Sequence, residues 1–355
     1  MASDRARRRH SVSTMKAVQL VAIGEPLELR EIAIPDVGAK EILVRVKAAG
    51  ICRSDVHYRS GLGSVGSLPH TPGHEVAGVI ERLGSDVEGL EMGQRVALHY
   101  LVTCGECSMC RTGREQFCRK GNMIGKDIAG GYAEFISIPA RNAVPLPEEV
   151  PIEHGAVLMC STATVFHALS KARLVPGESV AIVGVGGLGL SAVQLALAFG
   201  ATSVFAIDID EAKLSTATGY GAIPINASVV DPVQEVIRRT DGGVDVSLEL
   251  IGLAKTMRQA VEMLGIQGRC VLVGLASDPL VVDTYGSILG KEAEIVGCSD
   301  HLLSELPTIV ELTRQGRLDL SSVVTREVPL DATAVNDSLN ELESFSGIVR
   351  TVIKP

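Results

Sequence analysis

The feature of the sequence that most restricts the fold is a regular alternation of apolar and helix-like segments that begins near Pro176. The segments "SVAIVGV", "TSVFAID", "VDVSLELIG", "RCVLVGL" and "AEIVGCS" are almost continuously apolar, and segments such as "GLGLSAVQLALAFG" and "TMRQAVEMLG" separate them. Strands that are apolar on both faces must be covered on both faces, and helices between successive strands provide that cover. The sequence therefore predicts an α/β fold with a doubly wound parallel sheet.

The first of these strands leads into a glycine-rich turn. Its sequence, "VGVGGLGL", contains Gly184, Gly186, Gly187, Leu188 and Gly189. A lone G-x-G-x-x-G is weak evidence in a chain with 37 glycines. Here a strand precedes the motif, a helix follows it, and Asp208 ends the next strand about twenty residues later.

Such a turn lets the backbone approach a pyrophosphate at the helix N-terminus, and the acid accepts hydrogen bonds from the ribose hydroxyls. The alternative is a strand-to-helix turn with a structural role only. We expect a dinucleotide site, and we expect NAD rather than NADP because a 2′-phosphate would meet the negative charge of Asp208.

Four of the eight cysteines lie in one short window, "CGECSMCRTGREQFC". They are Cys104, Cys107, Cys110 and Cys118. Two C-x-x-C steps and a further cysteine suit a zinc ion with four thiolate ligands, which would stabilise a segment that has few apolar residues. Disulfides are the alternative, but a chain of this length without a secretory signal does not need them. We expect a structural zinc site and a reducing, cytoplasmic location.

The part of the chain before Pro176 has a different pattern. Short segments of alternating polarity, such as "EILVRVKA" and "EVAGVIERLG", are separated by glycine and proline and predict antiparallel strands. With 355 residues the chain is long enough for two domains. We expect a disordered tail over residues 1–14, a β-rich catalytic domain from 15–161 and 299–355, and a dinucleotide-binding domain from 162–298.

Charge and hydropathy argue against several kinds of partner. A net charge of −9 disfavours nucleic acid and anionic membrane surfaces. The sequence has no run of eighteen apolar residues that would suit a membrane-spanning helix. The basic opening "MASDRARRRHSVST" lacks the apolar region of a secretory signal. The expected partner is therefore a small molecule.

Three scattered residues could together hold a second metal ion. Cys52 follows a strand-like run, His74 precedes the segment "EVAGVIERLG", and Cys160 lies where the two patterns meet. Two thiolates and one imidazole make a catalytic zinc site that keeps one position open. Each residue alone is more often a core residue than a ligand. The two remaining cysteines, Cys270 and Cys298, lie in apolar strands and are expected in the core.

At this point the sequence resembles a known family. The segments "GICRSD", "GHEVAG", "CGECSMCRTGREQFC", "MCSTATVFHAL", "VGVGGLG" and "GIVRTVI" are similar, in this order, to those of the zinc-dependent medium-chain alcohol dehydrogenases, over nearly all of residues 15–355. The resemblance implies a GroES-like β domain, a Rossmann domain and two zinc ions per chain, one catalytic and one structural. It also implies a homotetramer that transfers a hydride between a primary or secondary alcohol and NAD (class EC 1.1.1.-, with 1.1.1.1 favoured).

The resemblance also assigns roles to residues near the catalytic metal. The three scattered residues match its ligands, and Glu75 matches a carboxylate that lies behind them or serves as an alternate ligand. Asp55 matches the residue that orients His74. Ser54 matches the hydroxyl that takes the substrate proton, and His57 matches the residue that passes this proton toward solvent.

Further matches concern the cofactor and the substrate. Residues that match cofactor contacts are Arg53, Thr164, Lys213, Leu275 and Arg350. Tyr100 matches a wall of the substrate pocket, and the glycine-rich loop "RSGLGSVGSLPHT" is expected to form another wall.

Two alternatives to a simple alcohol dehydrogenase stay open. The segment "GICRSDVHY" is also similar to polyol dehydrogenases, which carry a Glu-Pro pair where this chain has Cys160 and Ser161. This difference favours simple alcohols but does not exclude a polyol, sugar or cyclic alcohol. A non-enzymatic NAD-binding structural protein is the more remote alternative, because all the ligand and relay residues are present.

Overall fold

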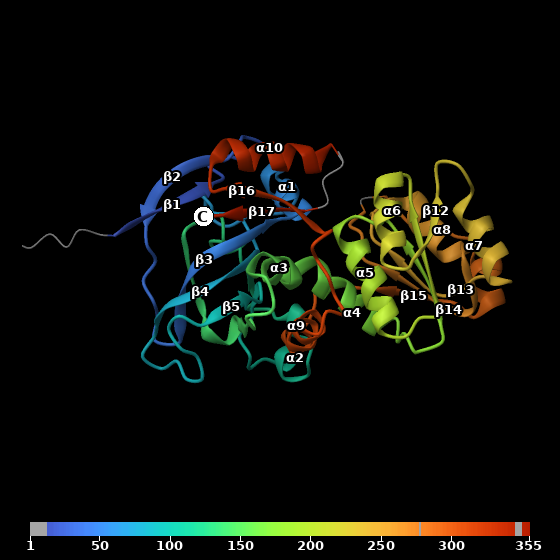
Figure 1. Cartoon of the computed structure of the whole chain (residues 1–355), viewed down its shortest axis with the longest axis horizontal. Coiled ribbons are helices and arrows are strands. Elements are labelled where there is room, and N and C mark those ends of the chain that lie inside the picture. The colour runs from blue at the N-terminus through green and yellow to red at the C-terminus, as the bar shows by residue number, and fades with distance from the viewer. Residues whose placement is uncertain (1–12, 277, 345–349) are drawn as a thin grey trace, which may run out of the picture.

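The structure is a computed structural model that describes residues 13–276, 278–344 and 350–355. Two sheets lie at opposite ends of an elongated molecule, with helices between them (Figure 1). The expected tail, residues 1–14, lies largely outside the described residues, and strand β1 (Thr14–Gln19) begins at the last residue of that range. Within the described ranges, no helix combines the length and apolarity that crossing a bilayer requires.

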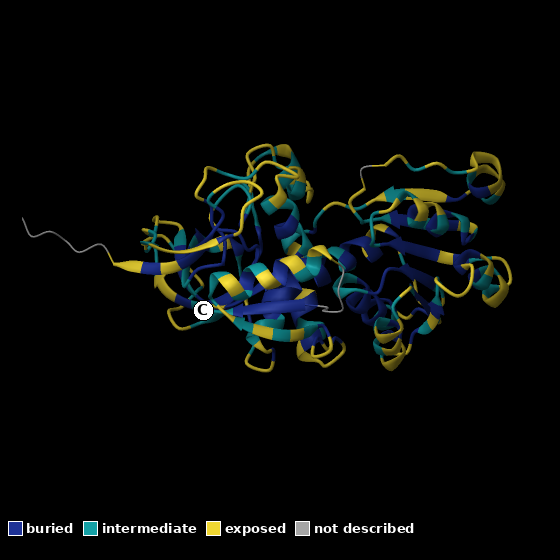
Figure 2. Ribbon diagram, turned by 90° about the horizontal axis from the view of Figure 1, so that it is seen from above, coloured by how far each residue is buried: buried dark blue, intermediate teal, exposed yellow. Residues whose placement is uncertain are grey.

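The alternating segments form a parallel sheet, as predicted. In the described part of the chain its strands are, in spatial order, β12 (Ile223–Asn226), β11 (Ser203–Asp208), β10 (Ser179–Val183), β13 (Val244–Glu249), β14 (Leu264–Leu272) and β15 (Glu294–Gly297). The helices that accompany them are α5 (Gly187–Ala198), α6 (Glu211–Gly219), α7 (Pro232–Thr240) and α8 (Ala254–Glu262). The chain reverses direction across the sheet between β10 and β13, which is the topological switch point of a doubly wound Rossmann sheet. The central strands are buried between helices, whose outer faces are exposed (Figure 2).

The first part of the chain forms a second, mixed sheet. Its described strands are, in spatial order, β16 (Val324–Pro329), β17 (Arg350–Lys354), β3 (Glu41–Ile51), β4 (Glu75–Leu83), β5 (Arg95–Leu98) and β9 (Ala143–Pro145), and β8 (Phe135–Pro139) also pairs with β3. The predicted antiparallel pairing is confirmed except between β16 and β17, which are parallel. Because β17 pairs with β3, the end of the chain packs against its beginning.

Smaller elements surround this sheet. They are β2 (Glu28–Ala33), β6 (Leu101–Val102), β7 (Asn122–Met123), α1 (Arg53–Ser60), α2 (Ser108–Arg111), α10 (Ala332–Glu343), η1 (Glu115–Phe117) and η2 (Ala140–Asn142). Strand β1 pairs with β2, and β6 pairs with β7. Helix α10 packs beside α1 (Figure 1).

One long helix joins the two sheets. It consists of α3 (Ile152–Val157), a π-helical turn η3 (Leu158–Thr162) and α4 (Ala163–Lys171). Helix α9 (Leu306–Arg314) packs against it, and short turns η4 (Thr284–Ile288), η5 (Leu289–Lys291) and η6 (Leu303–Glu305) complete the chain. One apolar core runs through this junction, from Ala77 of the mixed sheet to Leu190 of α5. The domain boundaries at 161/162 and 298/299 stay a prediction.

Candidate metal and dinucleotide sites

A group of four metal-ligating side chains lies at one end of the mixed sheet. Strands β3 and β4 pair so that Gly50 is opposite Glu75, which brings Cys52, just after β3, close to His74, just before β4. Cys160 reaches the group from η3. One ligand atom from each of Cys52, His74, Glu75 and Cys160 lies within 4.8 Å of the others, and the two sulfur atoms are 4.0 Å apart.

Two backbone features make this arrangement possible. A Cβ atom at position 50 would collide with the carboxylate of Glu75, so only glycine leaves room for that side chain. The π-helical turn η3 inserts one extra residue per turn into the long helix, and such turns occur often at functional sites. The sequence shows no pattern that predicts this turn.

Asp55 orients the imidazole of the group. Its Oδ2 accepts hydrogen bonds from the backbone N–H of Cys52 and the hydroxyl of Tyr132, each at 2.9 Å, and its Oδ1 is 3.4 Å from Nδ1 of His74. Burial alone would lower the pKa of His74, but Asp55 and Cys52 outweigh burial and raise it. Sequence reasoning missed Tyr132, which is fully buried and lies in an ordinary apolar context.

The chemistry of the donor set fits a zinc ion. The hydrogen bond from Cys160 lowers the pKa of the Cys52 thiol, which favours a thiolate there, and the same contact together with burial raises the pKa of Cys160. Nε2 of His74 and Oε2 of Glu75 are buried without a hydrogen-bond partner among the described residues. A cation with sulfur and nitrogen preferences would satisfy these atoms.

Behind this group, Glu75 forms an ion pair with Arg350. The Nη2–Oε1 distance is 2.6 Å, and Nη1 of Arg350 donates to the carbonyl of Ile51 at 3.2 Å. Burial raises the pKa of Glu75 to about 7, and Arg350 opposes this rise. A Cβ atom at Gly187 would lie 3.4 Å from Nε of Arg350, so this guanidinium reaches from the metal-ligating group to the glycine turn.

Helix α1 presents the expected relay residues on its first turns. Oγ of Ser54 is 3.8 Å from Sγ of Cys52. His57 lies three residues later and is therefore on the same face of the helix. Burial, with a smaller effect of Arg53, lowers the pKa of His57. Arg53 and His57 are both partly exposed.

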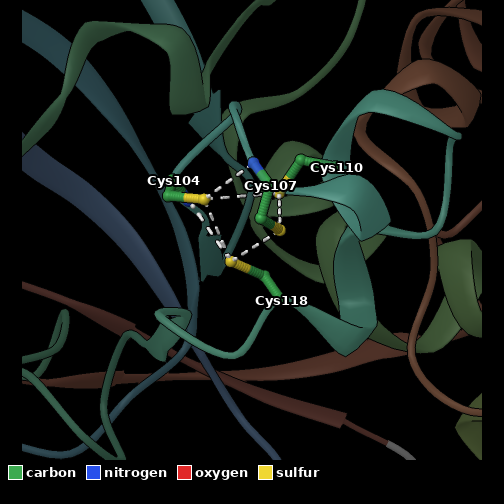
Figure 3. A group of neighbouring side chains, drawn as sticks. All are labelled: Cys104, Cys107, Cys110 and Cys118. Carbon is green, nitrogen blue, oxygen red and sulfur yellow. Dashed lines mark hydrogen bonds between the residues drawn. The ribbon is translucent and has the colours of Figure 1, made fainter.

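The four clustered cysteines come together in a separate lobe (Figure 3). Neighbouring sulfur atoms are 3.5 to 3.9 Å apart, and none of the eight cysteines forms a disulfide. Four ligands at a Zn–S distance of about 2.3 Å define a tetrahedron with an edge of about 3.8 Å. Backbone N–H groups of Glu106 and Cys107 lower the pKa of Cys104 to about 6, which favours its thiolate. The geometry fits zinc, and the distances between these sulfur atoms are too long for a disulfide bond.

The glycine turn has the geometry that a pyrophosphate site requires. Gly184 has a φ of 96°, and a Cβ atom at Gly189 would collide with the carbonyl of Gly184. Around Gly186 there is open space for a ligand. Asp208 supports the turn, since its Oδ2 accepts a hydrogen bond of 2.9 Å from the N–H of Val185. Leu188 lies in the first turn of α5 and is half-buried.

The other expected cofactor residues lie in different surroundings. Nζ of Lys213 is 3.8 Å from Oδ2 of Asp210. Leu275 is exposed. Thr164 is half-buried on α4, where its carbonyl accepts a contact of 3.8 Å from the thiol of Cys298. Cys298 is therefore only partly in the core.

Two further expectations concern the core and the pocket walls. Cys270 is fully buried, as expected. Tyr100 packs edge-on against His74, with ring centroids 5.4 Å apart, and so lies against the metal-ligating group. In the glycine-rich loop 59–71, His70 pairs with Leu20, and Val65 packs against the apolar cluster that includes Cys52 and Cys160.

Comparison with known proteins agrees with these sites. Residues 38–148 match the model of the alcohol dehydrogenase GroES-like domain, and residues 187–314 match that of the zinc-binding dehydrogenase domain. The NAD-dependent alcohol dehydrogenase of Saccharolobus solfataricus is 34% identical over 96% of this chain and 100% of its own length. The L-idonate 5-dehydrogenase of Vitis vinifera is 32% identical over 88% of this chain and 87% of its own.

A solved structure extends the agreement to the fold. The alcohol dehydrogenase from Thermus sp. ATN1 superimposes with a TM-score of 0.88 and 29% identity, covering 96% of this chain and 99% of that one. Two groups of side chains that could hold a metal, a glycine turn on a Rossmann sheet and relatives above 30% identity lead to one assignment. The chain belongs to the zinc-dependent medium-chain alcohol dehydrogenase family.

Proposed function

We propose that this protein interconverts a primary or secondary alcohol and its aldehyde or ketone by hydride transfer to and from NAD, in class 1.1.1.1. The observation that carries this proposal is the position of Arg350. This one buried guanidinium pairs with Glu75 of the metal-ligating group and also lies beside Gly187 of the dinucleotide turn. A substrate held at the metal group would therefore be adjacent to the cofactor, as hydride transfer requires.

Two zinc ions per chain are part of the proposal. Cys52, His74 and Cys160 would hold one, which would supply Lewis-acid activation of the substrate oxygen. Glu75 would serve as a neighbour or alternate ligand, since its unpartnered oxygen points to the same place. The four cysteines of the lobe would hold the other ion and leave it no open position.

The residues of α1 would move the proton. The hydroxyl of Ser54 is 3.8 Å from Sγ of Cys52, so it would accept the proton that the substrate alcohol loses. His57 would pass that proton toward solvent, and its lowered pKa keeps the imidazole neutral and able to accept a proton at neutral pH. Asp55 would act only through His74, whose ring it orients.

The remaining residues would bind the cofactor. Backbone N–H groups after Gly186, with Arg350 and Arg53, would bind the pyrophosphate. Asp208 would accept hydrogen bonds from the adenosine ribose, near Lys213. Thr164 and Leu275 would lie toward the nicotinamide.

Zinc analysis and turnover test the proposal together. The purified protein should contain about two zinc ions per chain and oxidise simple alcohols with NAD. Ser54→Ala should lower kcat at least about 100-fold, because a general acid–base step is lost, while the Kd for NAD stays within twofold. Ser170→Ala, which changes a serine on the remote face of α4, is the matched control and should have no effect. Unchanged turnover in Ser54→Ala would remove Ser54 from the relay.

We also propose a cytoplasmic homotetramer. A reducing compartment suits eight cysteines without a disulfide. Strand β15 is an edge of the parallel sheet, and Ile295 on it and the nearby Tyr285 and Leu289 are exposed apolar side chains that association would cover. Light scattering after size-exclusion chromatography tests this assembly, and a monomer would refute it.

A further inference from the structure

A tyrosine and an aspartate connect the two sheets beside the metal-ligating group. Tyr100 follows β5 and packs against His74, while Asp300 follows β15 of the parallel sheet. The Tyr100 hydroxyl donates a hydrogen bond of 2.9 Å to Oδ1 of Asp300. A carboxylate that follows the last strand of the parallel sheet is thereby held next to Tyr100, which packs against His74.

The backbone holds Asp300 in an unusual conformation. Its φ is 52°, in the left-handed region that asparagine and aspartate tolerate better than other non-glycine residues. The next residue, His301, is fully buried, and its Nε2 is 3.1 Å from Nδ1 of His99. Two residues further, the N–H of Leu303 donates to Glu115 at 2.7 Å. The contacts of His301 and Leu303 therefore hold the backbone that follows Asp300 in place.

The carboxylate still has capacity to accept hydrogen bonds. Asp300 is only partly buried, and its oxygens receive the Tyr100 hydroxyl and the Ser299 hydroxyl, the latter at 3.2 Å. A carboxylate has about four acceptor positions, so about two remain. A hydroxyl that approached from the metal-ligating group would find a charged acceptor in place.

The charges of the metal-ligating group and of Asp300 act on the same tyrosine of α1, Tyr58. Burial raises the pKa of the Tyr58 phenol, and Asp55, Cys52, Cys160 and Asp300 raise it further. Tyr100 lies between the metal-ligating group and Asp300, because its ring packs against His74 and its hydroxyl donates to Asp300.

We propose that Asp300 is a specificity-determining residue which accepts a hydrogen bond from a second hydroxyl group of the substrate, so that the preferred substrates are neutral diols. The proposal rests on the proposed dehydrogenase function and names its substrate class. A carboxylate or phosphate on the substrate would be repelled by Asp300. An ammonium group would lie close to a bound metal ion and the oxidised nicotinamide ring, which are both positive.

The test compares 2,3-butanediol with 2-butanol, which differ by one hydroxyl. A site that hydrogen-bonds a substrate hydroxyl rejects the analogue without it, so kcat/KM should favour the diol by about 10- to 100-fold. Asp300→Asn keeps a residue that tolerates the left-handed region and keeps an oxygen for Tyr100, but it loses the charge. This variant should lose at least about 10-fold in kcat/KM for the diol and less than about threefold for 2-butanol. Titration of NADH fluorescence should give the same pattern in the Kd values of the two compounds for the NADH-loaded protein.

The control is Asp241→Asn, since Asp241 ends α7 with a φ of 53° and lies away from both metal groups. It should change neither compound's kinetics. Equal losses for both compounds in Asp300→Asn, or a wild-type protein that does not prefer the diol, would overturn the substrate class and leave the dehydrogenase function standing. Absence of turnover on every alcohol with zinc and NAD present would refute the dehydrogenase function itself, and this proposal with it.

Discussion

At the scale of single residues, the candidate metal site depends on hydrogen bonds between side chains that are far apart in the sequence. Asp55 is the centre of these contacts, because it receives one hydrogen bond from Cys52, one from Tyr132 and lies beside His74. Residues that orient a metal-bound histidine strongly influence metal affinity. Tyr132 therefore influences the position of His74 indirectly, through its hydrogen bond to Asp55.

Replacing Tyr132 with phenylalanine tests this dependence. The variant keeps the buried ring but removes the hydroxyl that Asp55 accepts, so zinc affinity should fall about 10-fold or more. Competition with a chromogenic chelator measures this change without reference to activity. Tyr220→Phe is the matched control, since its hydroxyl donates a similar bond of 3.1 Å to the carbonyl of Asp319, remote from the site. Equal zinc affinity in both variants would show that Tyr132 has only a packing role.

Asp208 should determine the choice between the two dinucleotides. In Asp208→Ser, the negative charge that would face a 2′-phosphate is lost, so the kcat/KM ratio for NAD over NADP should fall about 10-fold or more. Asp210→Ser removes the same charge two residues later and keeps a residue that can cap α6, so its ratio should stay near that of the wild type. An unchanged ratio in Asp208→Ser would refute the assigned role.

The sequence predicted the site residues unevenly, and the reason is physical. Cys52, His74 and Cys160 could be proposed because only few residue types ligate zinc and because they stand in recognisable segments. Tyr132 and Asp300 could not be proposed, since tyrosine and aspartate are common and their partners are 77 and 200 positions away in the chain. Their importance comes from contacts, which only the folded structure defines.

At the scale of elements, we expect the stability of the cysteine lobe to depend on the proposed zinc ion. Helix α2 and turn η1 have no buried residues, so they bury almost no apolar surface of their own. A zinc ion bound by the four cysteines would stabilise the lobe in place of an apolar core.

Removal of one ligand tests this view. Cys107→Ala should reduce the zinc content to about one ion per chain and lower Tm by several degrees, as plasma emission and calorimetry would measure. Cys298→Ala, which changes a half-buried cysteine outside both groups, should keep about two ions and nearly the same Tm. Two ions per chain in Cys107→Ala would contradict the four-thiolate site.

Elements with a strong period were predicted well, and those without one were not. The apolar strands β10, β11 and β13 and the helix α5 lie where the pattern placed them. Strand β12 contains Pro224, and a proline in so short a segment is more typical of a turn. The strand can still form because it lies at the edge of the sheet, where proline is tolerated. The π-helical turn has no periodic signature at all, because it arises from the packing on either side of it.

At the scale of the whole molecule, the pair His99 and His301 makes stability depend on pH. Burial, with a smaller effect of Arg141, lowers the pKa of His99 to about 3, below the ordinary 6.5 that an unfolded chain would have. As the pH falls from 6.5 toward 3, the unfolded state takes up a proton that the folded state does not. The free energy of unfolding therefore decreases across this window, by about 2 kcal/mol at pH 5 for this group.

Urea unfolding at pH 7 and pH 5 measures the effect. In His99→Asn, the loss of stability between the two pH values should be smaller than in the wild type by about 2 kcal/mol. His154 is more exposed than His99, and burial lowers its pKa too. His154→Asn should therefore reduce the loss of stability between pH 7 and pH 5 much less. An equal loss in the wild type and His99→Asn would show that His99 is protonated in the folded state.

The extra residue in the helix from Ile152 to Lys171 also determines the directions in which the side chains of α3 and α4 point relative to each other. Each residue of an α-helix turns the chain by about 100°, so deleting one residue from η3 would rotate α3 by about that angle relative to α4. The apolar side of α3, around Ala156, would then turn away from β3 and β4, and Cys160 would turn away from Cys52. The π-helical turn thus fixes the rotation of α3 relative to α4. In this rotation α3 packs on β3 and β4 while Cys160 faces Cys52.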